Sequence, residues 1–193
     1  MPPSLDDLKG ALEDIIADSR RAADVIQRLR ELLRKGELRQ IRLDLNRVIG
    51  DVTRLLGSDA IIRNINMRLD LDSSPALVSG DRVQLEQVIL NLLLNAMDAM
   101  AEVAEGERTV VIRSRQTPEK SVHVAVEDSG TGFRAGTKDR VFEPFYTTKP
   151  TGMGMGLCIA KSIIEEHGGA IWAANNTSRG ATIHFTLPTA AQA

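Results

Sequence analysis

Apolar and small residues recur along the first 36 positions at alternating steps of three and four. They are Leu5, Leu8, Leu12, Ile15, Ser19, Ala22, Ile26, Leu29 and Leu33. This spacing predicts a helix over residues 4–35 that packs in a coiled coil or helical bundle and ends at Gly36. Such a helix would be about 45 Å long, too long for one small domain to cover. We therefore expect a bundle or oligomerisation helix, with a lone amphipathic helix folded onto its own domain as the alternative.

Shorter elements follow Gly36. The patterning predicts strands at residues 41–45, 64–71, 76–78, 109–115, 121–127, 170–174 and 181–187. It predicts helices from Asn46, a candidate N-cap, to about Gly57, and over residues 81–103 and 156–167. Residues 128–154 are rich in loop-forming residues. This order of elements indicates one long helix followed by an α+β sandwich.

Composition narrows the class of protein. The chain has 193 residues, 42% hydrophobic and 26% charged, which is typical of a globular protein with a buried core. A net charge of −2 argues against nucleic acid as a partner, and no apolar run reaches the ~18 residues of a membrane span. The single cysteine, Cys158, excludes a disulfide framework. We expect a cytoplasmic segment without membrane contact, and leave open whether the parent protein is membrane-anchored.

The helix over residues 81–103 carries a polar stripe opposite its leucine-rich face. Asn91, Asn95 and Asp98 are separated by four and three residues, so they share one side of the helix. Asparagine lowers helix stability relative to alanine, and two in register suggest a purpose. Amide oxygens are suitable ligands for Mg²⁺ beside substrate phosphates. A solvated polar face is the alternative.

Two glycine-containing segments are further candidates for ligand binding. Asp128 ends a predicted strand and is followed by Gly130 and Gly132, which would let a ligand approach the backbone while the carboxylate accepts a hydrogen bond. Taken alone, this segment is equally typical of an ordinary turn. The second segment has glycines at positions 152, 154 and 156, directly before a predicted helix. Backbone N–H groups at a helix N-terminus bind anions, most often phosphate.

Together these segments resemble the ATP-binding catalytic domain of sensor histidine kinases, a family shared with DNA gyrase, heat-shock chaperone and mismatch-repair ATPases. Residues 91–96 resemble its asparagine box, 128–132 and 152–157 its two glycine boxes, and 142–149 its phenylalanine box. The resemblance covers residues 40–188 and implies a two-layer α/β sandwich with a mixed sheet and about three helices. Residues 4–36 resemble the second helix of the dimerisation and phosphotransfer hairpin. The implied organisation is a hairpin helix (1–37), a catalytic domain (38–188) and a tail (189–193).

The resemblance also implies a role for each residue. Asn95 would ligate Mg²⁺, Asn91 would support the ATP phosphates, and Asp128 would accept a hydrogen bond from the adenine amino group. The segment of residues 134–154, called the lid segment below, would be mobile and anchored by Phe142 and Phe145. The remaining implied contacts to ATP are Gly130 and Gly132 at the base, and Lys149, Gly152, Gly154, Gly156 and Leu157 at the phosphates. Thr182 would either reach adenine through water or be structural.

One position distinguishes the activities of the wider family. Hydrolysing relatives place a glutamate one turn before the magnesium ligand, where this chain has Asn91, an amide that cannot take a proton at neutral pH. We therefore expect phosphoryl transfer to a protein histidine, with ATP and Mg²⁺ as cofactors. A stand-alone ATPase or serine kinase, and a non-catalytic regulatory module, are the alternatives.

The implied partners follow from the kinase reading. None of the three histidines is followed by the acidic residue typical of a phosphoacceptor, so the acceptor helix would come from outside this sequence. The other implied partners are a response regulator receiver domain and a second copy of the chain, paired through the dimerisation helices.

Overall fold

In this computed structural model, residues 40–134, 136–149 and 152–190 are described. The chain divides into two compact units, residues 1–36 and residues 37–193. The helix expected over residues 4–35 lies outside the described residues. No helix in the described part of the chain is long and apolar enough to cross a membrane.

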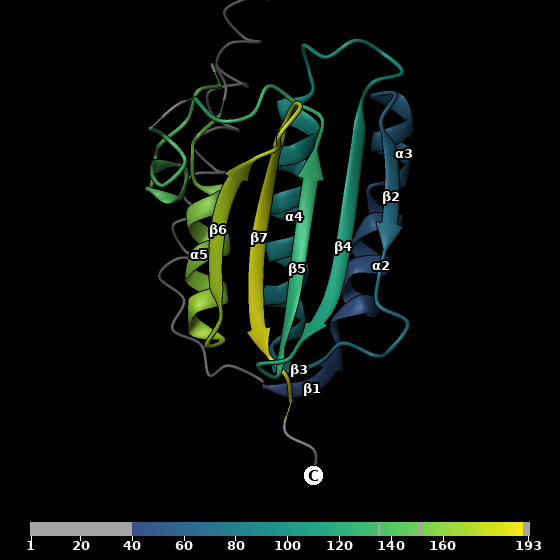
Figure 1. Cartoon of the computed structure of the whole chain (residues 1–193), viewed down its shortest axis with the longest axis vertical. Coiled ribbons are helices and arrows are strands. Elements are labelled where there is room, and N and C mark those ends of the chain that lie inside the picture. Colours follow the sequence, from purple (N-terminus) through teal and green to yellow (C-terminus); the bar gives the residue numbers. More distant parts are fainter. Residues whose placement is uncertain (1–39, 135, 150–151, 191–193) are drawn as a thin grey trace, which may run out of the picture. The chain divides into compact units, whose positions relative to one another are not determined.

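A five-stranded mixed sheet forms the centre of the second unit (Figure 1). Its strand order is β2 (Asn66–Asp70), β4 (Thr109–Thr117), β5 (Ser121–Asp128), β7 (Ala181–Pro188) and β6 (Ala170–Asn175). The pairing of β2 with β4 is parallel, and the other three pairings are antiparallel. A second, two-stranded antiparallel sheet pairs β1 (Ile41–Asp44) with β3 (Leu77–Gly80). The expected mixed sheet is confirmed.

Four α-helices and one 3-10 turn complete the described fold: α2 (Leu45–Leu55), α3 (Gly57–Ile62), α4 (Arg82–Ala99), α5 (Gly156–Glu166) and η1 (Arg140–Phe142). Helices α2, α4 and α5 lie behind the sheet in Figure 1, so they cover one of its faces. The expectation of about three helices missed α3. Gly57 was expected only to end the helix that begins near Asn46, but it is the first residue of the further helix α3. The N-cap of α2 is Asp44, whose side chain accepts from the backbone of Asn46, so the capping role predicted for Asn46 is wrong.

The core lies between the sheet and the helices. Alternate residues of β5 and β7 are buried, which is the period of two expected of a sheet with one covered face. Helix α4 buries a full side against them, including Leu85, Ile89 and Leu93, each at most 1% exposed. Burying each such side chain stabilises the fold by roughly 1.5–3 kcal/mol. The core therefore fixes the rotation of α4 and with it the direction of the polar stripe.

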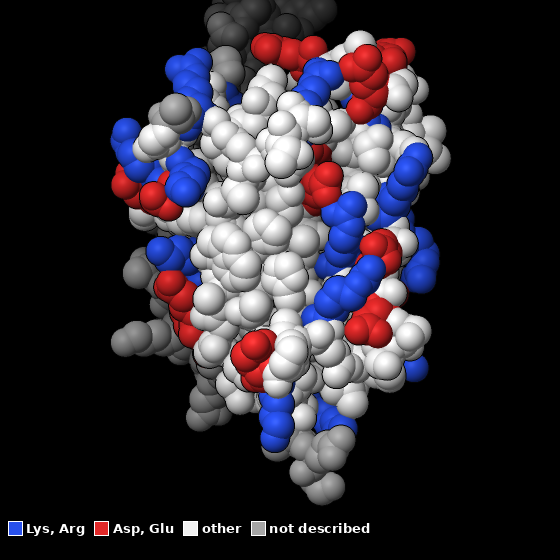
Figure 2. Space-filling model, in the orientation of Figure 1, with Lys and Arg blue, Asp and Glu red and all other residues white. Residues whose placement is uncertain are grey.

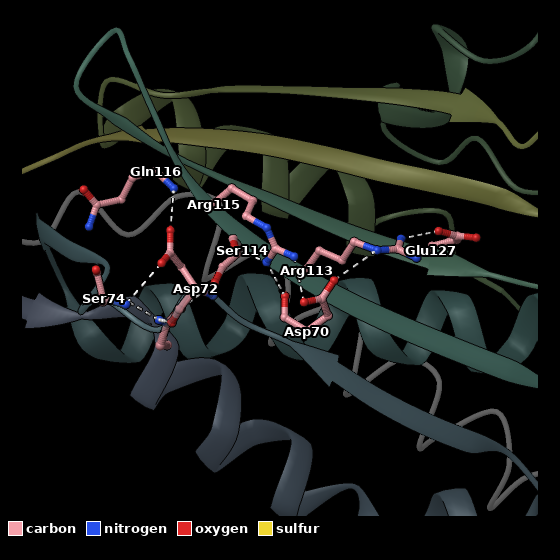
Figure 3. Close-up of polar contacts among 9 residues, drawn as sticks. Asp70, Asp72, Ser74, Arg113, Ser114, Arg115, Gln116 and Glu127 are labelled. Atoms are coloured by element: carbon pink, nitrogen blue, oxygen red, sulfur yellow. Dashed lines mark hydrogen bonds and ion pairs between the residues drawn. The ribbon is translucent and has the colours of Figure 1, made fainter.

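The uncovered face of the sheet has a charged part and an uncharged part (Figure 2). On β2 and β4, Arg115 binds Asp70 at 2.7 Å, and Arg113 binds Glu127 of β5 (Figure 3). These side chains are between one third and one half exposed, so each pair contributes little to stability.

Three rings occupy the uncharged part of this face. His123, His184 and Trp172 come from β5, β7 and β6, and their planes lie within 14° of one another. Nε2 of His123 lies 3.2 Å from Nδ1 of His184, while the ring centroids are 5.3 Å apart. These two distances place the imidazoles edge to edge, with one ring donating an N–H to the other. Burial lowers the pKa of both histidines, in keeping with neutral rings.

Candidate nucleotide-binding site

The polar stripe of α4 starts from a fixed helix end. Asp81 is the N-cap, and its carboxylate accepts from the backbone N–H of Val83 at 2.9 Å and of Gln84 at 3.2 Å. A cap of this kind is worth about 1 kcal/mol. With the start fixed and the leucines of α4 in the core, Asn91 and Asn95 lie together on the side facing the lid segment and α5.

Asn91 lies beside the start of α5. A β-carbon built on Gly156 would be 3.8 Å from both Cγ and Oδ1 of Asn91, which is ordinary van der Waals contact. The Nδ2 atom of Asn91 is buried and has no hydrogen-bond partner among the described residues. Leaving a buried donor unpaired costs about 1–3 kcal/mol. A ligand that offers Nδ2 an acceptor would therefore bind favourably here. A phosphate oxygen at the start of α5 would supply one.

Asn95 presents an oxygen to a cation. Its Oδ1 accepts from the ammonium of Lys149 at 3.2 Å, and the same ammonium lies 3.1 Å from Oδ2 of Asp98. No cluster of three or more histidine, cysteine or acidic side chains suited to a metal exists in the described ranges. A metal at Asn95 would therefore depend on phosphate and water for most of its ligands, as Mg²⁺ commonly does. The donor chemistry fits Mg²⁺.

Asp128 is a buried carboxylate at the end of β5. It is 6% exposed, and its Oδ1 accepts from the backbone N–H of Gly130 at 2.7 Å and of Ala181 at 3.3 Å. Burial raises the pKa of Asp128, and these two hydrogen bonds oppose that rise. Both bonds go to Oδ1, so Oδ2 is the oxygen suited to accept from a ligand.

The backbone around Asp128 is closely packed. A β-carbon on Gly130 would lie 2.6 Å from the carbonyl oxygen of Ala99, so only glycine fits where β5 ends beside α4. Sequence reasoning missed two further residues here, Asn175 and Asn176. Asn175 exchanges two hydrogen bonds with the backbone of Phe133, at 2.7 and 2.8 Å. The only sequence signal for this pair was two asparagines at the end of a strand.

Asn176 explains the position of Thr182. Its Nδ2 donates to the carbonyl oxygen of Asp128 at 2.9 Å, and its Oδ1 accepts from the hydroxyl of Thr182 at 2.6 Å. Thr182 is 7% exposed. These contacts support the structural alternative for Thr182 over a contact to adenine through water.

The lid segment contacts the domain differently from the expectation. Phe145 is 64% exposed, with a φ of 65°, so its predicted role as an anchor is wrong. Its left-handed backbone belongs to a sharp turn, and the ring stays in solvent. Val141 of η1 is 7% exposed and is the anchoring side chain. Phe142 is partly buried, with the ammonium of Lys161 at 6.0 Å from its ring centre.

The second glycine segment leads into α5 without a capping side chain. Met155 occupies the N-cap position and its side chain is fully buried, so no described side chain binds the first N–H groups of α5. Free N–H groups at a helix start favour an anion. Gly154 has a φ of 65°, and a β-carbon there would lie 2.4 Å from the carbonyl oxygen of Tyr146. Leu157 is 9% exposed, so only its backbone N–H suits a phosphate contact.

The predicted site residues therefore fall into two groups. One group joins α4, the lid segment and the start of α5, through Asn91, Asn95, Lys149 and Gly156. The other lies at the ends of β5 and β6, around Asp128. A long ligand with an anionic end and a hydrogen-bond donor at its other end suits this pair of groups.

Comparison with known proteins identifies the family. Residues 80–191 match the model of the histidine kinase-, DNA gyrase B- and HSP90-like ATPases. The chain belongs to this family. It is 39% identical over 188 residues to the sensor protein FixL of Bradyrhizobium diazoefficiens, an alignment that covers 97% of this chain and 37% of FixL. It is 34% identical over 164 residues to the sensor histidine kinase ZraS of Escherichia coli K12, covering 85% of this chain and 34% of ZraS.

Solved structures agree with this assignment. The catalytic domain of histidine kinase ThkA has a TM-score of 0.70 and 33% identity, and the match covers 80% of this chain and 97% of that domain. A structure of ThkA in complex with the response regulator TrrA has a TM-score of 0.79 and 28% identity, covering 97% of this chain and 53% of ThkA. The chain thus contains an ATP-binding domain of the histidine kinase type, and it spans about a third of the length of the curated relatives.

Proposed function

We propose that this chain binds Mg-ATP and donates the γ-phosphoryl group to a histidine on a dimerisation helix, as the catalytic part of a two-component sensor histidine kinase. The observation that carries the proposal is the polar stripe of α4. There an amide oxygen already holds a cation, and one turn away a buried amide donor lacks an acceptor beside the start of α5.

The nucleotide would extend from the end of β5 to the start of α5. Oδ2 of Asp128 accepts from the adenine amino group, and Gly130 and Gly132 let the base approach the backbone. At the other end, Lys149 and the N–H groups of residues 152–157 bind the phosphates, and Nδ2 of Asn91 donates to one of their oxygens. Asn95 ligates Mg²⁺, which when bound neutralises part of the phosphate charge.

The site favours transfer over hydrolysis because no side chain on the stripe is suited to activate water. Asn91 carries an amide where a base would be needed. The carboxylate of Asp98 binds Lys149 through one oxygen and the guanidinium of Arg63, at 2.9 Å, through the other. Asp98 also lies about two turns of α4 beyond Asn91, away from the start of α5 where the phosphates would bind. An ATPase function is therefore disfavoured.

The phosphoacceptor would come from elsewhere than residues 40–190. Nδ1 of His167 lies 2.7 Å from the carbonyl oxygen of Ile163, and Nε2 accepts from the N–H of Asp81 at 3.0 Å, so both ring nitrogens are engaged. His123 and His184 lie on the sheet and bind each other. Transfer requires the acceptor in line with the γ-phosphate, which a histidine on a bundle helix can satisfy.

The proposed organisation follows. Residues 1–37 would be the second helix of the dimerisation hairpin, 38–188 the catalytic domain and 189–193 a tail. A homodimer would form through the hairpins. A response regulator receiver domain would then accept the phosphoryl group from the histidine. The ThkA structure with its response regulator supports this last partner. The location would be cytoplasmic.

A nucleotide titration with a phosphate-release assay tests this function. Calorimetry of the chain with ATP, in Mg²⁺ and in EDTA, should show binding that Mg²⁺ strengthens, while steady-state release of inorganic phosphate stays at the uncatalysed rate. Failure to bind ATP would favour a non-catalytic module. Sustained phosphate release would favour a stand-alone ATPase.

A further inference from the structure

The proposed function assigns a ligand contact to Asn91 and Asn95 of the polar stripe but none to its third member, Asp98. It lies one turn beyond Asn95 near the end of α4. Its two oxygens bind two different cations: Oδ1 lies 2.9 Å from Arg63, at the end of α3, and Oδ2 lies 3.1 Å from Lys149. Asp98 thus connects a fixed helix end to the lid segment.

The ammonium of Lys149 lies on the atom that the proposed function assigns to Mg²⁺. It donates to Oδ1 of Asn95 at 3.2 Å while it is paired with Asp98. An ammonium and a divalent ion cannot share that oxygen, because their like charges would lie only a few ångströms apart. Lysine has to leave Asn95 when the metal arrives.

We propose that Asp98 is a positioning residue that holds Lys149 on Asn95 while the site is empty, so that loading of Mg-nucleotide exchanges one cation for another. The inference rests on the proposed function, since it requires Mg²⁺ at Asn95. After the exchange, Lys149 binds the phosphates, and Asp98 keeps its pair with Arg63.

The surroundings of Asp98 suit this role. Arg63 also binds Asp59 at 3.1 Å, so its guanidinium is shared between two carboxylates. The pair of Asp98 with Lys149 uses the other oxygen of Asp98. The hydrogen bond to Asp98 raises the pKa of Arg63, so the guanidinium stays charged. The side chains of Lys149 and Asp98 are 34% and 43% exposed, so the pair between them is weak and easily exchanged. A pair of this kind would alter nucleotide affinity by about two- to fivefold.

A simpler role for Asp98 is a fixed negative charge that repels the phosphates. Both roles predict that Asp98→Asn strengthens nucleotide binding. They differ in whether the effect needs Lys149. Release of a held lysine requires the lysine, whereas repulsion between Asp98 and a phosphate does not.

A double-mutant cycle separates the two roles. Mg-ATP affinity is measured by calorimetry for the parent chain, Asp98→Asn, Lys149→Met and the double variant. We expect Asp98→Asn to tighten binding by about two- to fivefold in the parent and to leave it unchanged in the Lys149→Met background. Arg63→Gln is the matched control, because it removes the other ion pair of Asp98 and should not tighten binding.

Amine reactivity gives a second readout that needs no nucleotide. In the empty site, acetylation of Lys149 by limiting acetic anhydride, followed by mass spectrometry, should be faster in Asp98→Asn than in the parent and unchanged at Lys138. The inference is overturned if Asp98→Asn tightens binding equally in both backgrounds or does not tighten it in the parent chain. It is also overturned if Arg63→Gln tightens binding, or if Asp98→Asn leaves the acetylation of Lys149 unchanged. A parent chain that does not bind Mg-ATP would refute the proposed function as well, which distinguishes the two failures.

Discussion

Replacing Asp128 by asparagine separates its role in binding from its effect on stability. Asparagine has the same shape and keeps an oxygen that can accept from Gly130 and Ala181, at 2.7 and 3.3 Å in the parent. The change converts Oδ2 from an acceptor into an NH₂ donor and removes a negative charge from a position that is 6% exposed. The adenine amino group would then face a donor.

The expected loss of affinity follows from the hydrogen bond involved. A bond to a charged acceptor is worth about 1.5–3 kcal/mol, so ATP affinity should fall roughly ten- to a hundredfold. Stability should change in the opposite direction. Burial raises the pKa of Asp128, which means that the ionised form is disfavoured in the folded protein. The asparagine variant avoids that cost, so it should unfold at the same or a higher temperature without nucleotide.

Calorimetry with ATP and GTP, together with thermal unfolding of the nucleotide-free protein, measures both effects. Glu127→Gln is the matched control, because it makes the same chemical change at the neighbouring residue, on the uncovered face where Glu127 binds Arg113. It should leave ATP affinity unchanged. The reasoning is refuted if Asp128→Asn binds ATP as tightly as the parent, if the parent binds GTP and ATP equally, or if affinity and unfolding temperature fall together.

Three further predictions concern the same site. Asn95→Ala should abolish the strengthening of ATP binding by Mg²⁺ while leaving the unfolding temperature within a few degrees; equal Mg-ATP affinity in variant and parent, by calorimetry, would contradict the assignment. Gly154→Ala should weaken ATP binding because its β-carbon would meet the carbonyl of Tyr146 at 2.4 Å, whereas Gly50→Ala, with nothing within 4 Å on α2, should bind ATP normally and be more stable by up to about 1 kcal/mol. For pH, the raised pKa of Asp128 means that its carboxyl contributes stability in acid that is lost as pH rises past its ordinary value of 3.8. The free energy of unfolding of Asp128→Asn, measured in urea, should therefore exceed that of the parent by more at neutral pH than in acid. A difference that stays constant with pH would contradict a raised pKa for Asp128.

Local periodicity predicted most of the described elements. The leucine pattern of α4 and the alternation in β5 and β7 gave these elements to within a few residues at most ends. Such patterns arise because one face of the element is buried, and the buried face appears in the sequence as a regular spacing of apolar residues. Helix α3 was missed because it has only six residues and a single buried side chain, Ala60. A helix that short leaves no periodic signal.

The shared helix face of the candidate site residues was predictable from the sequence, but their contacts were not. Spacing along one helix placed Asn91 and Asn95 on a common face, and the structure has them there. The contact of Lys149 with Asn95 joins residues 54 positions apart, and only the folded lid segment brings them together. Phe145 shows the opposite case, since an aromatic residue expected to be buried is 64% exposed in a left-handed turn. Neither outcome follows from local pattern.

Transfer of the γ-phosphoryl group to a supplied histidine is the most direct test of the proposed kinase function. The chain is incubated with γ-labelled Mg-ATP, alone and with a dimerisation and phosphotransfer helix that carries a candidate phosphoacceptor histidine, added as a separate chain. We expect no acid-labile phosphohistidine on the chain alone, and labelling of the supplied histidine that Asn95→Ala abolishes. Stable labelling of His123, His167 or His184, or steady release of phosphate without labelling of the helix, would contradict it.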